Sequence, residues 1–279
     1  FEKNKNFKFI NADIRNLNAC RKAVDGCEIV FHQAALGSVP RSIKDPFTTN
    51  SVNIDGFLNM LTASKEKKVK RFIYAASSST YGDLEELPKI EERIGEPISP
   101  YAITKVVNEH LARVYSRLYN IETIGLRYFN VFGKNQNPNG AYAAVIPIWI
   151  KKLINLESPI INGDGNYSRD FTYVENVIQA NERAAVIPTN ILQKKTNDYH
   201  LKYNKRKIYK ETSEAVMEVF NVAFGESTTL NELFSLLINN LSKFDERIKK
   251  IKPIKSTIRA GDVPHSLASI KKANFILGY

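Results

Sequence analysis

Short apolar runs recur along the chain at intervals that suit a parallel α/β fold. They are rich in β-branched and aromatic residues and read FKFINA at 7–12, EIVFHQA at 28–34, RFIYAAS at 71–77, ETIGLRYFNV at 122–131 and VFNVAF at 219–224. Helix-like segments separate the first four runs, and parallel neighbours in a sheet need such crossover connections. The pattern predicts a parallel sheet covered by helices.

The spacing of apolar residues predicts two of the connecting helices. Residues 53–69, NIDGFLNMLTASKEKKV, carry apolar side chains at helical spacing before the run at 71–77. Residues 101–119, YAITKVVNEHLARVYSRLY, follow a Ser-Pro pair and predict an amphipathic helix of about five turns. Tyr101 and Lys105 then lie on one face of its first turn.

Composition changes along the chain suggest a second, smaller region and an insertion. Residues 137–172 are richer in Asn, Pro and Gly, which suggests a region laid over the ligand edge of the sheet. Residues 186–217 are polar, basic and weakly periodic, and predict an insertion that forms a long surface loop with at most a little helix. We therefore expect a first domain at 1–135, to which 172–185 and 218–224 return, and a second domain at 136–171 and 225–279.

The length and cysteine content exclude the class of small proteins that are stabilised by several disulfides. The 279 residues suffice for one large or two modest domains, and Cys20 and Cys27 are too few for a disulfide framework. The four histidines are scattered without the spacing of metal ligands, so we expect a reducing compartment and no metal. No apolar run approaches the roughly 20 residues of a membrane span, which predicts a cytoplasmic protein that does not contact a membrane.

The formal net charge of +11 leaves several partners open. It is compatible with nucleic acid, an acidic surface or a phosphorylated ligand. Lysines spread over solvated faces explain it as well, and this interpretation is the one we favour. We expect no nucleic-acid partner.

A tyrosine four residues before a lysine occurs twice in the chain. Tyr101 and Lys105 lie in SPYAITK, and Tyr203 and Lys207 lie in YNKRK. The second pair falls inside the predicted insertion with no strand before it, so we interpret it as accidental. The first pair suits a base, because a phenol with a pKa near 10 needs a nearby positive charge to ionise at neutral pH, and a lysine ammonium supplies it.

A row of hydroxyl side chains strengthens this interpretation. The stretch YAASSSTYG ends a predicted strand with Ser77, Ser78, Ser79 and Thr80. Ligands of parallel α/β sheets bind at the carboxyl ends of the strands. A serine there can hydrogen-bond the reacting oxygen of a sugar beside Tyr101, while a hydride leaves the same carbon for a nicotinamide.

At these residues the chain resembles the extended short-chain dehydrogenase/reductase family. Within it the chain is similar to the bacterial 4-epimerases of UDP-N-acetylhexosamines, which also act on the uronic-acid forms and serve surface-polysaccharide synthesis. The similar stretches span almost the whole sequence: FKFINADIRN, HQAALGSVPRSIKDP, NIDGFLNML, YAASSSTYGD, SPYAITK, GLRYFNVFG, NGAYAAVIP, INGDGNYSRDF and GDVPHSLASI. The resemblance implies a Rossmann-like NAD-binding domain at 1–135 and a C-terminal substrate-binding domain.

The resemblance also implies roles for individual residues. Catalytic roles fall on Ser77, Tyr101 and Lys105. Contacts with NAD fall on Asp13 and Ile14 at a strand end, on Gln33, Ala34, Ala35 and Val52, and on Tyr101 and Lys105. Contacts with the UDP-sugar fall on Gly37, Ser38, Ser77, Ser78, Ser79, Asn130, Gln136, Ala144, Arg169, Arg259 and Ser266. Two arginines suit a diphosphate because a guanidinium offers paired donors.

The implied reaction is a reversible oxidation at C4 of the sugar. Tyr101 takes the 4-hydroxyl proton, hydride passes to NAD, the 4-keto sugar turns over, and hydride returns to the other face. Related dehydratases and decarboxylases have acidic residues in the serine row, where this chain has Ser78, Ser79 and Thr80, so simple epimerisation is favoured. Ser266 stands where epimerases restricted to UDP-galactose have tyrosine, which leaves space for an N-acetyl group; the neutral sugar and its uronic acid both stay open.

The sequence departs from the family pattern at its two ends and in one insertion. No glycine-rich loop precedes Asp13, the chain begins at Phe1, and it ends at LGY, short of the family's final helix. We therefore expect a fragment that binds NAD poorly by itself. The basic insertion at 186–217 is the third departure, and we favour a tolerated surface loop.

Other interpretations remain open beside the epimerase. A catalytically inactive module that binds NAD or a sugar nucleotide is favoured by the missing loop and disfavoured by the intact Ser77, Tyr101 and Lys105. A nucleic-acid-associated protein is supported only by charge and the insertion. Because the relatives are homodimers that pair the helix with Tyr101, the resemblance also implies a homodimer.

Overall fold

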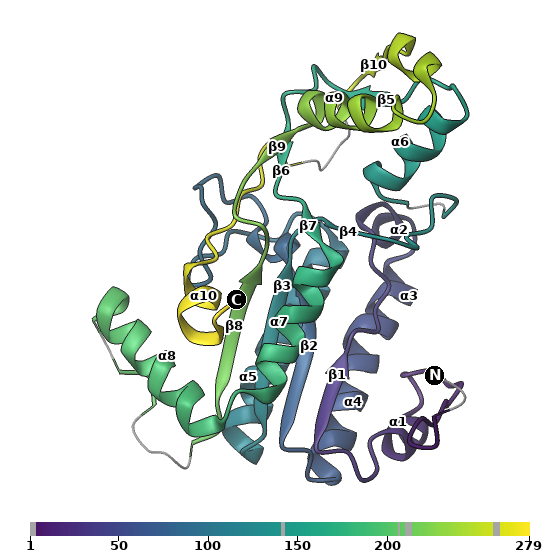
Figure 1. Ribbon diagram of the computed structural model, residues 1–279. Coiled ribbons are helices and arrows are strands. Elements are labelled where there is room, and N and C mark those ends of the chain that lie inside the picture. The colour runs from purple at the N-terminus through teal and green to yellow at the C-terminus, as the bar shows by residue number, and fades with distance from the viewer. Residues whose placement is uncertain (1–3, 141–142, 206, 210–213, 259–262) are drawn as a thin grey trace. The chain divides into compact units, whose positions relative to one another are not determined.

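The chain divides into two compact units. The computed structural model describes residues 4–140, 143–205, 207–209, 214–258 and 263–279 (Figure 1). The first unit holds 1–76, 100–125 and 184–219, and the second holds 77–99, 126–183 and 220–279. The domain boundaries expected from the sequence stay a prediction, because the units are defined by compactness and not by ligand contacts.

Four strands form the main sheet, in the order β1-β2-β3-β8. The strands are β1 (Ile29–His32), β2 (Arg71–Ser77), β3 (Glu122–Tyr128) and β8 (Met217–Val222). β1 and β2 run parallel, with Ile29 opposite Arg71 and His32 opposite Tyr74. The predicted α/β fold with a parallel sheet is confirmed, and β2 has the bounds that the run RFIYAAS predicts.

The first predicted strand is wrong. Residues 7–12 form no strand in the structure, and the side chain of Phe9 is 75% exposed. A strand needs a neighbour that pairs with its backbone N–H and C=O groups, and no described residue supplies one here. Apolar and β-branched composition alone therefore misled the assignment of this segment, including the strand end expected at Asp13 and Ile14.

The first unit holds several helices before β3, and a side chain caps the first three of them. They are α1 (Leu17–Ala23), α2 (Val39–Lys44), α3 (Pro46–Asn50), the π-helical turn η1 (Ser51–Asp55), α4 (Gly56–Glu66) and α5 (Pro100–Tyr119). The side chains of Ser38 and Asp45 accept the N–H groups of Arg41 and Thr48, and a proline stands in the first turn of α2, α3 and α5. The predicted helices at 53–69 and 101–119 are thus present, the first with a π turn at its start.

The core of the first unit lies between α1, α4, α5 and the strands. Leu61 and Phe72 are fully buried there, and Phe57 packs edge-on against Phe72 and Tyr74. α1 lies beside α4 in Figure 1 and packs against it. Burial of a large apolar side chain contributes about 1.5 to 3 kcal/mol, so this cluster holds the helices on the strands.

The second unit is built from short strands and helices. They are η2 (Ser78–Tyr81), β4 (Val131–Phe132), α6 (Val145–Ile154), β5 (Ile160–Asn162), β6 (Ser168–Arg169), β7 (Thr172–Tyr173), α7 (Val174–Val186), β9 (Thr228–Thr229), α9 (Leu230–Leu241), η3 (Glu246–Lys250), β10 (Ile254–Ser256) and α10 (Lys271–Leu277). α7 ends in the first unit, to which residues 184–186 belong. β4 pairs with β7 and β5 with β10 in parallel, and β6 pairs with β9 antiparallel.

A capping box and an aromatic cluster stabilise the second unit. The Thr229 side chain accepts the N–H of Glu232, whose carboxylate accepts the N–H of Thr229, at the start of α9. α9 lies along α6, where Trp149 packs edge-on against Phe234. The cluster of Ile146, Trp149, Ile161 and Leu233 gives the second unit a core of its own.

The basic insertion is not a loop in the structure. Residues 189–204 form a 16-residue helix, α8 (Thr189–Asn204), whose side chains Leu192, Gln193, Thr196, Tyr199 and His200 are buried. The hydroxyl of Tyr209, beyond the helix, accepts the N–H of Met217 and donates to its carbonyl in β8. The loop prediction was wrong because the buried residues of α8 are largely polar. A search for apolar residues at helical spacing does not detect a helix whose buried face is polar.

A buried ion pair joins the starts of two strands in the first unit. Arg71 Nε lies 2.6 Å from Glu122 Oε2, and both side chains are at most 10% exposed. The Arg71 Nη1 group donates to the carbonyls of Ala184, Ala185 and Ile187 at 2.8 to 3.0 Å. A guanidinium thus satisfies carbonyl groups at the C-terminal end of α7, which helices leave without partners.

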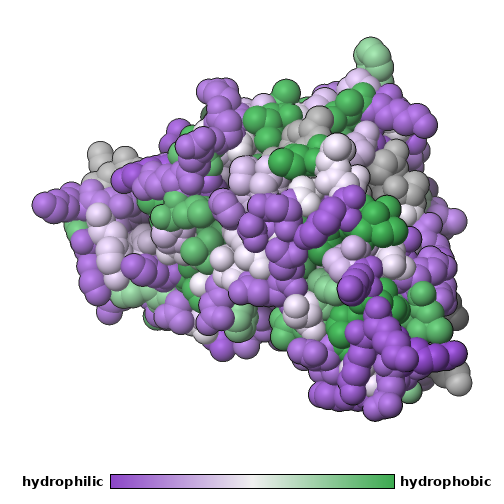
Figure 2. Space-filling view, turned by 90° about the horizontal axis from the view of Figure 1, so that it is seen from above, coloured by the Kyte–Doolittle hydropathy of each residue, from purple (hydrophilic) through white to green (hydrophobic). Residues whose placement is uncertain are grey.

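Polar residues cover much of the surface. Figure 2 shows hydrophilic residues spread among hydrophobic ones over the face it presents. Among the described residues, no helix is both long and apolar enough to cross a bilayer. In the same part of the chain, no group of His, Cys, Asp or Glu side chains is placed to hold a metal ion, and Cys20 and Cys27 are free thiols.

We expect Arg71→Leu to lower the free energy of unfolding by about 3 to 5 kcal/mol, because it leaves the Glu122 carboxylate buried without a partner. Urea denaturation of the variant and wild type measures this difference. Lys70→Met is the matched control, because its partner Glu28 and Lys70 itself are more than 70% exposed, and should change stability by less than about 1 kcal/mol. Equal effects of the two substitutions would contradict the assigned role of Arg71.

Candidate active site

Helix α5 and strand β2 fix the lysine of the SPYAITK motif. Lys105 is 3% exposed, and its Nζ donates a hydrogen bond of 2.7 Å to the carbonyl of Ala75 in β2. Tyr101 stands one helical turn earlier, half-buried, and its ring centroid lies 5.8 Å from the Lys105 Nζ. The structure therefore brings the predicted tyrosine and lysine together.

Burial makes the Lys105 ammonium unusually acidic. Loss of solvent lowers the pKa of Lys105 from 10.5 to about 8, and the Glu109 carboxylate one turn further along α5 opposes this lowering. His32, at the end of β1, is buried, and desolvation with the nearby Lys105 charge lowers its pKa to about 4. His32 is thus a neutral imidazole at neutral pH, and Lys105 carries the positive charge at this point of the fold.

The serine row forms a tight turn at the end of β2. Ser77 caps η2: its Oγ accepts the Ser79 N–H at 3.1 Å and the Ser79 hydroxyl at 2.9 Å. Thr80 donates back to the Ser77 carbonyl and is fully buried. Ser77 is 9% exposed, whereas Ser78 and Ser79 are half-buried.

The residues expected along NAD lie in two segments of the first unit. Asp13 is exposed and forms an ion pair of 2.6 Å with Arg15, whose hydrogen bonds lower the pKa of the Asp13 carboxyl to about 2. Ile14 packs onto the core and over Gly56, where a β-carbon would lie 2.6 Å from the Ile14 Cδ1. Glycine at 56 thus lets Ile14 approach helix α4.

The second segment follows β1. Gln33 and Ala34 are exposed and Ala35 is half-buried, and Gly37 and Ser38 lead into α2. Ser38 uses its hydroxyl as the N-cap of α2. Val52 lies half-buried in the π-helical turn η1.

Three of the residues expected at the nucleotide meet in the second unit. Asn130 donates to the carbonyl of Asp170 at 3.2 Å, and Arg169 donates to the carbonyls of Ser168 and Pro264. The Ser266 N–H donates to the Ser168 carbonyl at 3.1 Å. Segments about 130, 169 and 265 are therefore held side by side.

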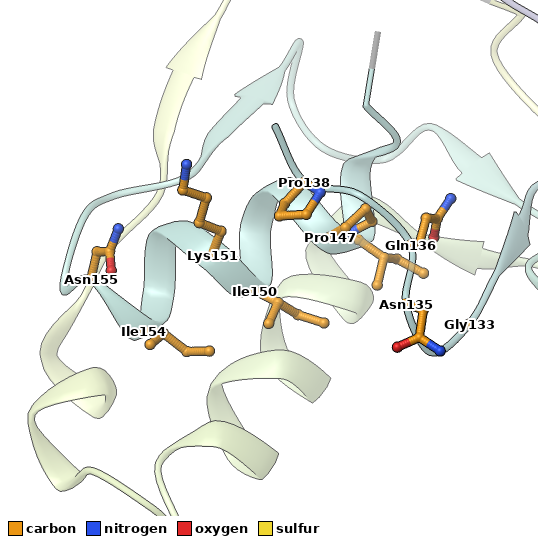
Figure 3. A pocket seen from close by; sticks show the side chains of 10 residues that line it. Gly133, Asn135, Gln136, Pro138, Pro147, Ile150, Lys151, Ile154 and Asn155 are labelled. Atoms are coloured by element: carbon orange, nitrogen blue, oxygen red, sulfur yellow. The ribbon is translucent and has the colours of Figure 1, made fainter. Parts of the chain in front are cut away.

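Gln136 and Ala144 flank a cavity at helix α6. Gln136 lines a cavity of about 350 Å³ with Pro138, Ile146, Pro147 and Ile150, which come from α6 and the loop before it (Figure 3). The buried Gln136 Oε1 accepts no hydrogen bond from the described residues. Ala144 is exposed as the N-cap residue of α6 and is not part of the lining.

Arg259 lies outside the described residues. Tyr203 lies in the last turn of α8, which ends at Asn204, so Lys207 is beyond the helix and the second Tyr-x-x-x-Lys spacing does not form a helical turn.

Two buried polar residues beside the expected sites escaped the sequence analysis. Asp170 is fully buried and accepts the N–H groups of Phe224, Gly225 and Ala268, and burial raises the pKa of its carboxyl. Asn53 is 1% exposed and bonds to the backbone of Leu36. Both stand in stretches that resemble the family, SRDF and NIDGF, but a single sequence does not show which polar residue of a stretch is buried.

This arrangement suits proton transfer beside a fixed positive charge. Of the three N–H donors of the Lys105 ammonium, one binds Ala75 O, which leaves donors for the hydroxyls of a ligand. A cation one turn from a phenol favours the phenolate. Asp13, Gln33 and Ala34 are exposed and Lys105 is buried, an arrangement that is chemically compatible with a dinucleotide cofactor.

We expect Lys105→Met to raise the free energy of unfolding of the cofactor-free protein at pH 7 by about 1 to 3 kcal/mol, because it removes a desolvated charge. In wild type the folded-state pKa of about 8 lies below the unfolded value of 10.5, so between these pH values the unfolded state binds more protons and stability rises with pH. The advantage of the variant should shrink across this window. Chemical denaturation at several pH values measures it, with the exposed Lys22→Met as control; a constant difference would contradict the argument.

Known proteins resemble the chain along nearly its whole length. Residues 1–199 match the NAD dependent epimerase/dehydratase family. Protein CapI of Staphylococcus aureus is 32% identical over 268 residues, which cover 95% of this chain and 75% of CapI.

Solved structures agree with this match. A UDP-N-acetylglucosamine 4-epimerase from Methanobrevibacter ruminantium, in complex with UDP-N-acetylmuramic acid, has a TM-score of 0.81 and 35% identity over 98% of this chain and 77% of its own. The UDP-glucuronic acid 4-epimerase of Bacillus cereus, in complex with UDP-glucuronic acid and NAD, has a TM-score of 0.79 and 28% identity over 100% of this chain and 77% of its own. With the tyrosine and lysine on one turn of α5, these similarities show that the chain belongs to the NAD dependent epimerase/dehydratase family.

Proposed function

We propose that the protein is a UDP-sugar 4-epimerase that acts on UDP-N-acetylglucosamine and UDP-N-acetylgalactosamine, or on their uronic acids, in surface-polysaccharide synthesis. The observation that carries the proposal is the buried Lys105 ammonium, fixed on Ala75 O one helical turn from Tyr101. A pair of this kind serves proton transfer, and the two solved structures named above are 4-epimerases by name.

Tyr101 is the proposed acid-base residue. Its phenolate takes the proton from the 4-hydroxyl of the sugar and returns it to the same oxygen at the end of the reaction. Lys105 stabilises the phenolate electrostatically, since a positive charge nearby lowers the pKa of a phenol. Bound NAD supplies the hydride chemistry, as an acceptor and then donor of hydride at C4.

The proposed hydroxyl partner of the sugar is Ser77, with Ser78 and Ser79 beside it. The turn at η2 holds the Ser77 oxygen by two hydrogen bonds from Ser79, so its direction is fixed before a ligand arrives. Preorganised groups lose less freedom on binding than mobile ones. None of these hydroxyls is acidic enough to catalyse elimination, which supports epimerisation over dehydration.

The remaining expected residues form the proposed binding regions. Asp13, Ile14, Gln33–Ala35 and Val52 are proposed to hold NAD, together with Tyr101 and Lys105. The UDP-sugar is proposed to bind Gly37, Ser38, Asn130, Gln136, Ala144, Arg169, Arg259 and Ser266. Support comes from the hydrogen bonds that hold Asn130, Arg169 and Ser266 side by side, and from the buried Gln136 oxygen that lacks a partner among the described residues.

We also propose a homodimer that pairs helix α5. The helix exposes apolar side chains that a partner would cover: Ile103 is 50%, Val114 48% and Leu118 67% exposed. Exposed apolar residues on one helix are a common feature of interfaces between copies of a chain.

Proton NMR of UDP-N-acetylglucosamine with the full-length protein and NAD tests the reaction. We expect a new anomeric signal of UDP-N-acetylgalactosamine, and Tyr101→Phe should lower turnover by about 10²- to 10⁴-fold with folding intact, because it removes the acid-base hydroxyl. Tyr203→Phe is the matched control from the second Tyr-x-x-x-Lys and should keep turnover within about twofold. Failure of wild type to convert the N-acetyl sugar and the uronic acid, with NAD bound, would favour an inactive binding module.

We expect Ser266→Tyr to close the site to N-acetylated sugars, because the phenol fills the space at C2. Competition between UDP-N-acetylglucosamine and UDP-glucose, followed by the same NMR signals, should show the ratio of kcat/KM values falling by about 10- to 100-fold, with Ser266→Ala unchanged. An unchanged ratio would place the selectivity elsewhere.

A further inference from the structure

A turn and a short helix after α9 carry a phenylalanine that the core of the second unit does not use. α9 ends at Leu241, and η3 follows a turn over 242–245. Phe244, in this turn, is 89% exposed, whereas Ile248 of η3 is 2% exposed and η3 packs against α9. Ile248 thus anchors the segment on the second unit, and the Phe244 ring contributes almost nothing to the core.

The same segment carries an excess of positive charge. Residues 243–252, KFDERIKKIK, form what we call the basic tip, and they hold five cationic side chains and two carboxylates. Arg247 pairs with Asp245 at 2.8 Å, and Lys249 pairs with Glu246 at 3.6 Å. The remaining lysines of the tip are exposed and form no ion pair with any described residue: Lys243, Lys250 and Lys252. Their charge is therefore not neutralised within this part of the fold.

The next strand adds exposed aliphatic side chains. β10 begins shortly after the basic tip, and its Ile254 is 55% exposed. Ile254 lies opposite Ile160 of β5 in the parallel pair, and Ile160 is 45% exposed. Partners opposite each other on neighbouring strands point to the same face, so the two side chains meet solvent side by side. Figure 1 shows β5, β10 and α9 together at one end of the second unit.

Lysines beside an exposed aromatic ring are typical of proteins that bind at a membrane surface. Each lysine near an anionic bilayer is attracted by the negative headgroups, and an aromatic ring enters the boundary between headgroups and acyl chains. Nucleic acid would match the charges and the ring of Phe244 but would leave Ile160 and Ile254 without an apolar partner. A bilayer offers negative charge and an apolar layer at one surface, so it fits all of these side chains.

We propose that the basic tip docks the protein onto the surface of a membrane that contains anionic lipids. The Phe244 ring enters the headgroup layer, and Lys243, Lys250 and Lys252 lie over the negative headgroups. The expectation of no membrane contact came from the lack of a spanning segment, and a surface contact needs none. The docking does not depend on the proposed reaction, because none of these residues belongs to the proposed active site.

Sedimentation of the full-length protein with lipid vesicles tests the docking. We expect binding to vesicles of equal parts phosphatidylglycerol and phosphatidylcholine, little binding to phosphatidylcholine alone, and weaker binding as salt is added. Lys250→Ala and Lys252→Ala should each lower the partition coefficient by about fivefold, and together by about 25-fold, because each lysine contributes separately. Lys271→Ala is the matched control, because Lys271 is exposed at the start of α10, away from α9 and β10 in Figure 1, and should change binding by less than about twofold.

Phe244 provides a second readout in two variants. Phe244→Ala should lower the partition coefficient by about tenfold, because no ring enters the apolar layer. Phe244→Trp should keep binding, and its added fluorescence should shift to shorter wavelength with the anionic vesicles, whereas Trp149 is 3% exposed and should not respond. Turnover and thermal stability should stay at wild-type values in both variants, because the side chain at 244 is exposed.

Several results would overturn the docking. They are equal binding to the two kinds of vesicle, equal losses in Lys250→Ala and Lys271→Ala, and an emission of Phe244→Trp that does not move. Binding of the tip to nucleic acid or to an acidic protein, with no binding to anionic vesicles, would assign it to another class of partner and would overturn the docking as well.

Discussion

The hydrogen bond from the Lys105 ammonium to the Ala75 carbonyl sets the first turn of α5 on strand β2. It places a positive charge in a nearly dry environment, where charge interactions are stronger than in water. The position of Tyr101, the neutral state of His32 and the hydrogen bonds of Thr104 all depend on where this turn lies. Burial of this charge lowers the stability of the fold, and the apolar core of the first unit contributes stabilisation that offsets the loss.

In both units, buried polar side chains fix the orientation of backbone segments through several hydrogen bonds each. Arg71 donates to a carboxylate and three carbonyls, Asp170 accepts three backbone N–H groups, and Asn53 bonds the N–H and C=O of Leu36 and one hydroxyl. Each group satisfies several partners that would otherwise be buried without one. Apolar side chains of the same size would pack as well but would not fix the angles of these segments.

The sequence predicted the parts of the fold whose burial follows an apolar period. β2 runs over the predicted residues, and the long helix after the Ser-Pro pair begins at Pro100. The segment at 7–12 has the composition of a strand, but pairing depends on a neighbour that a local pattern does not reveal. Helix α8 was missed for the opposite reason, because its buried residues include Gln193, Thr196 and His200. For the candidate site, the spacing of Tyr101 and Lys105 was sufficient, whereas Asn53 needed the three-dimensional contacts.

The insertion around α8 has a consequence for how the protein behaves at high concentration. β8 is the last strand in the described sheet order, and a bare final strand offers its backbone groups to strands of other molecules. The Tyr209 hydroxyl occupies both backbone groups of Met217 there, and α8 is folded onto the same unit. The backbone N–H and C=O of Met217 are therefore already hydrogen-bonded by a side chain of the insertion, so they are not free to pair with a strand of another molecule.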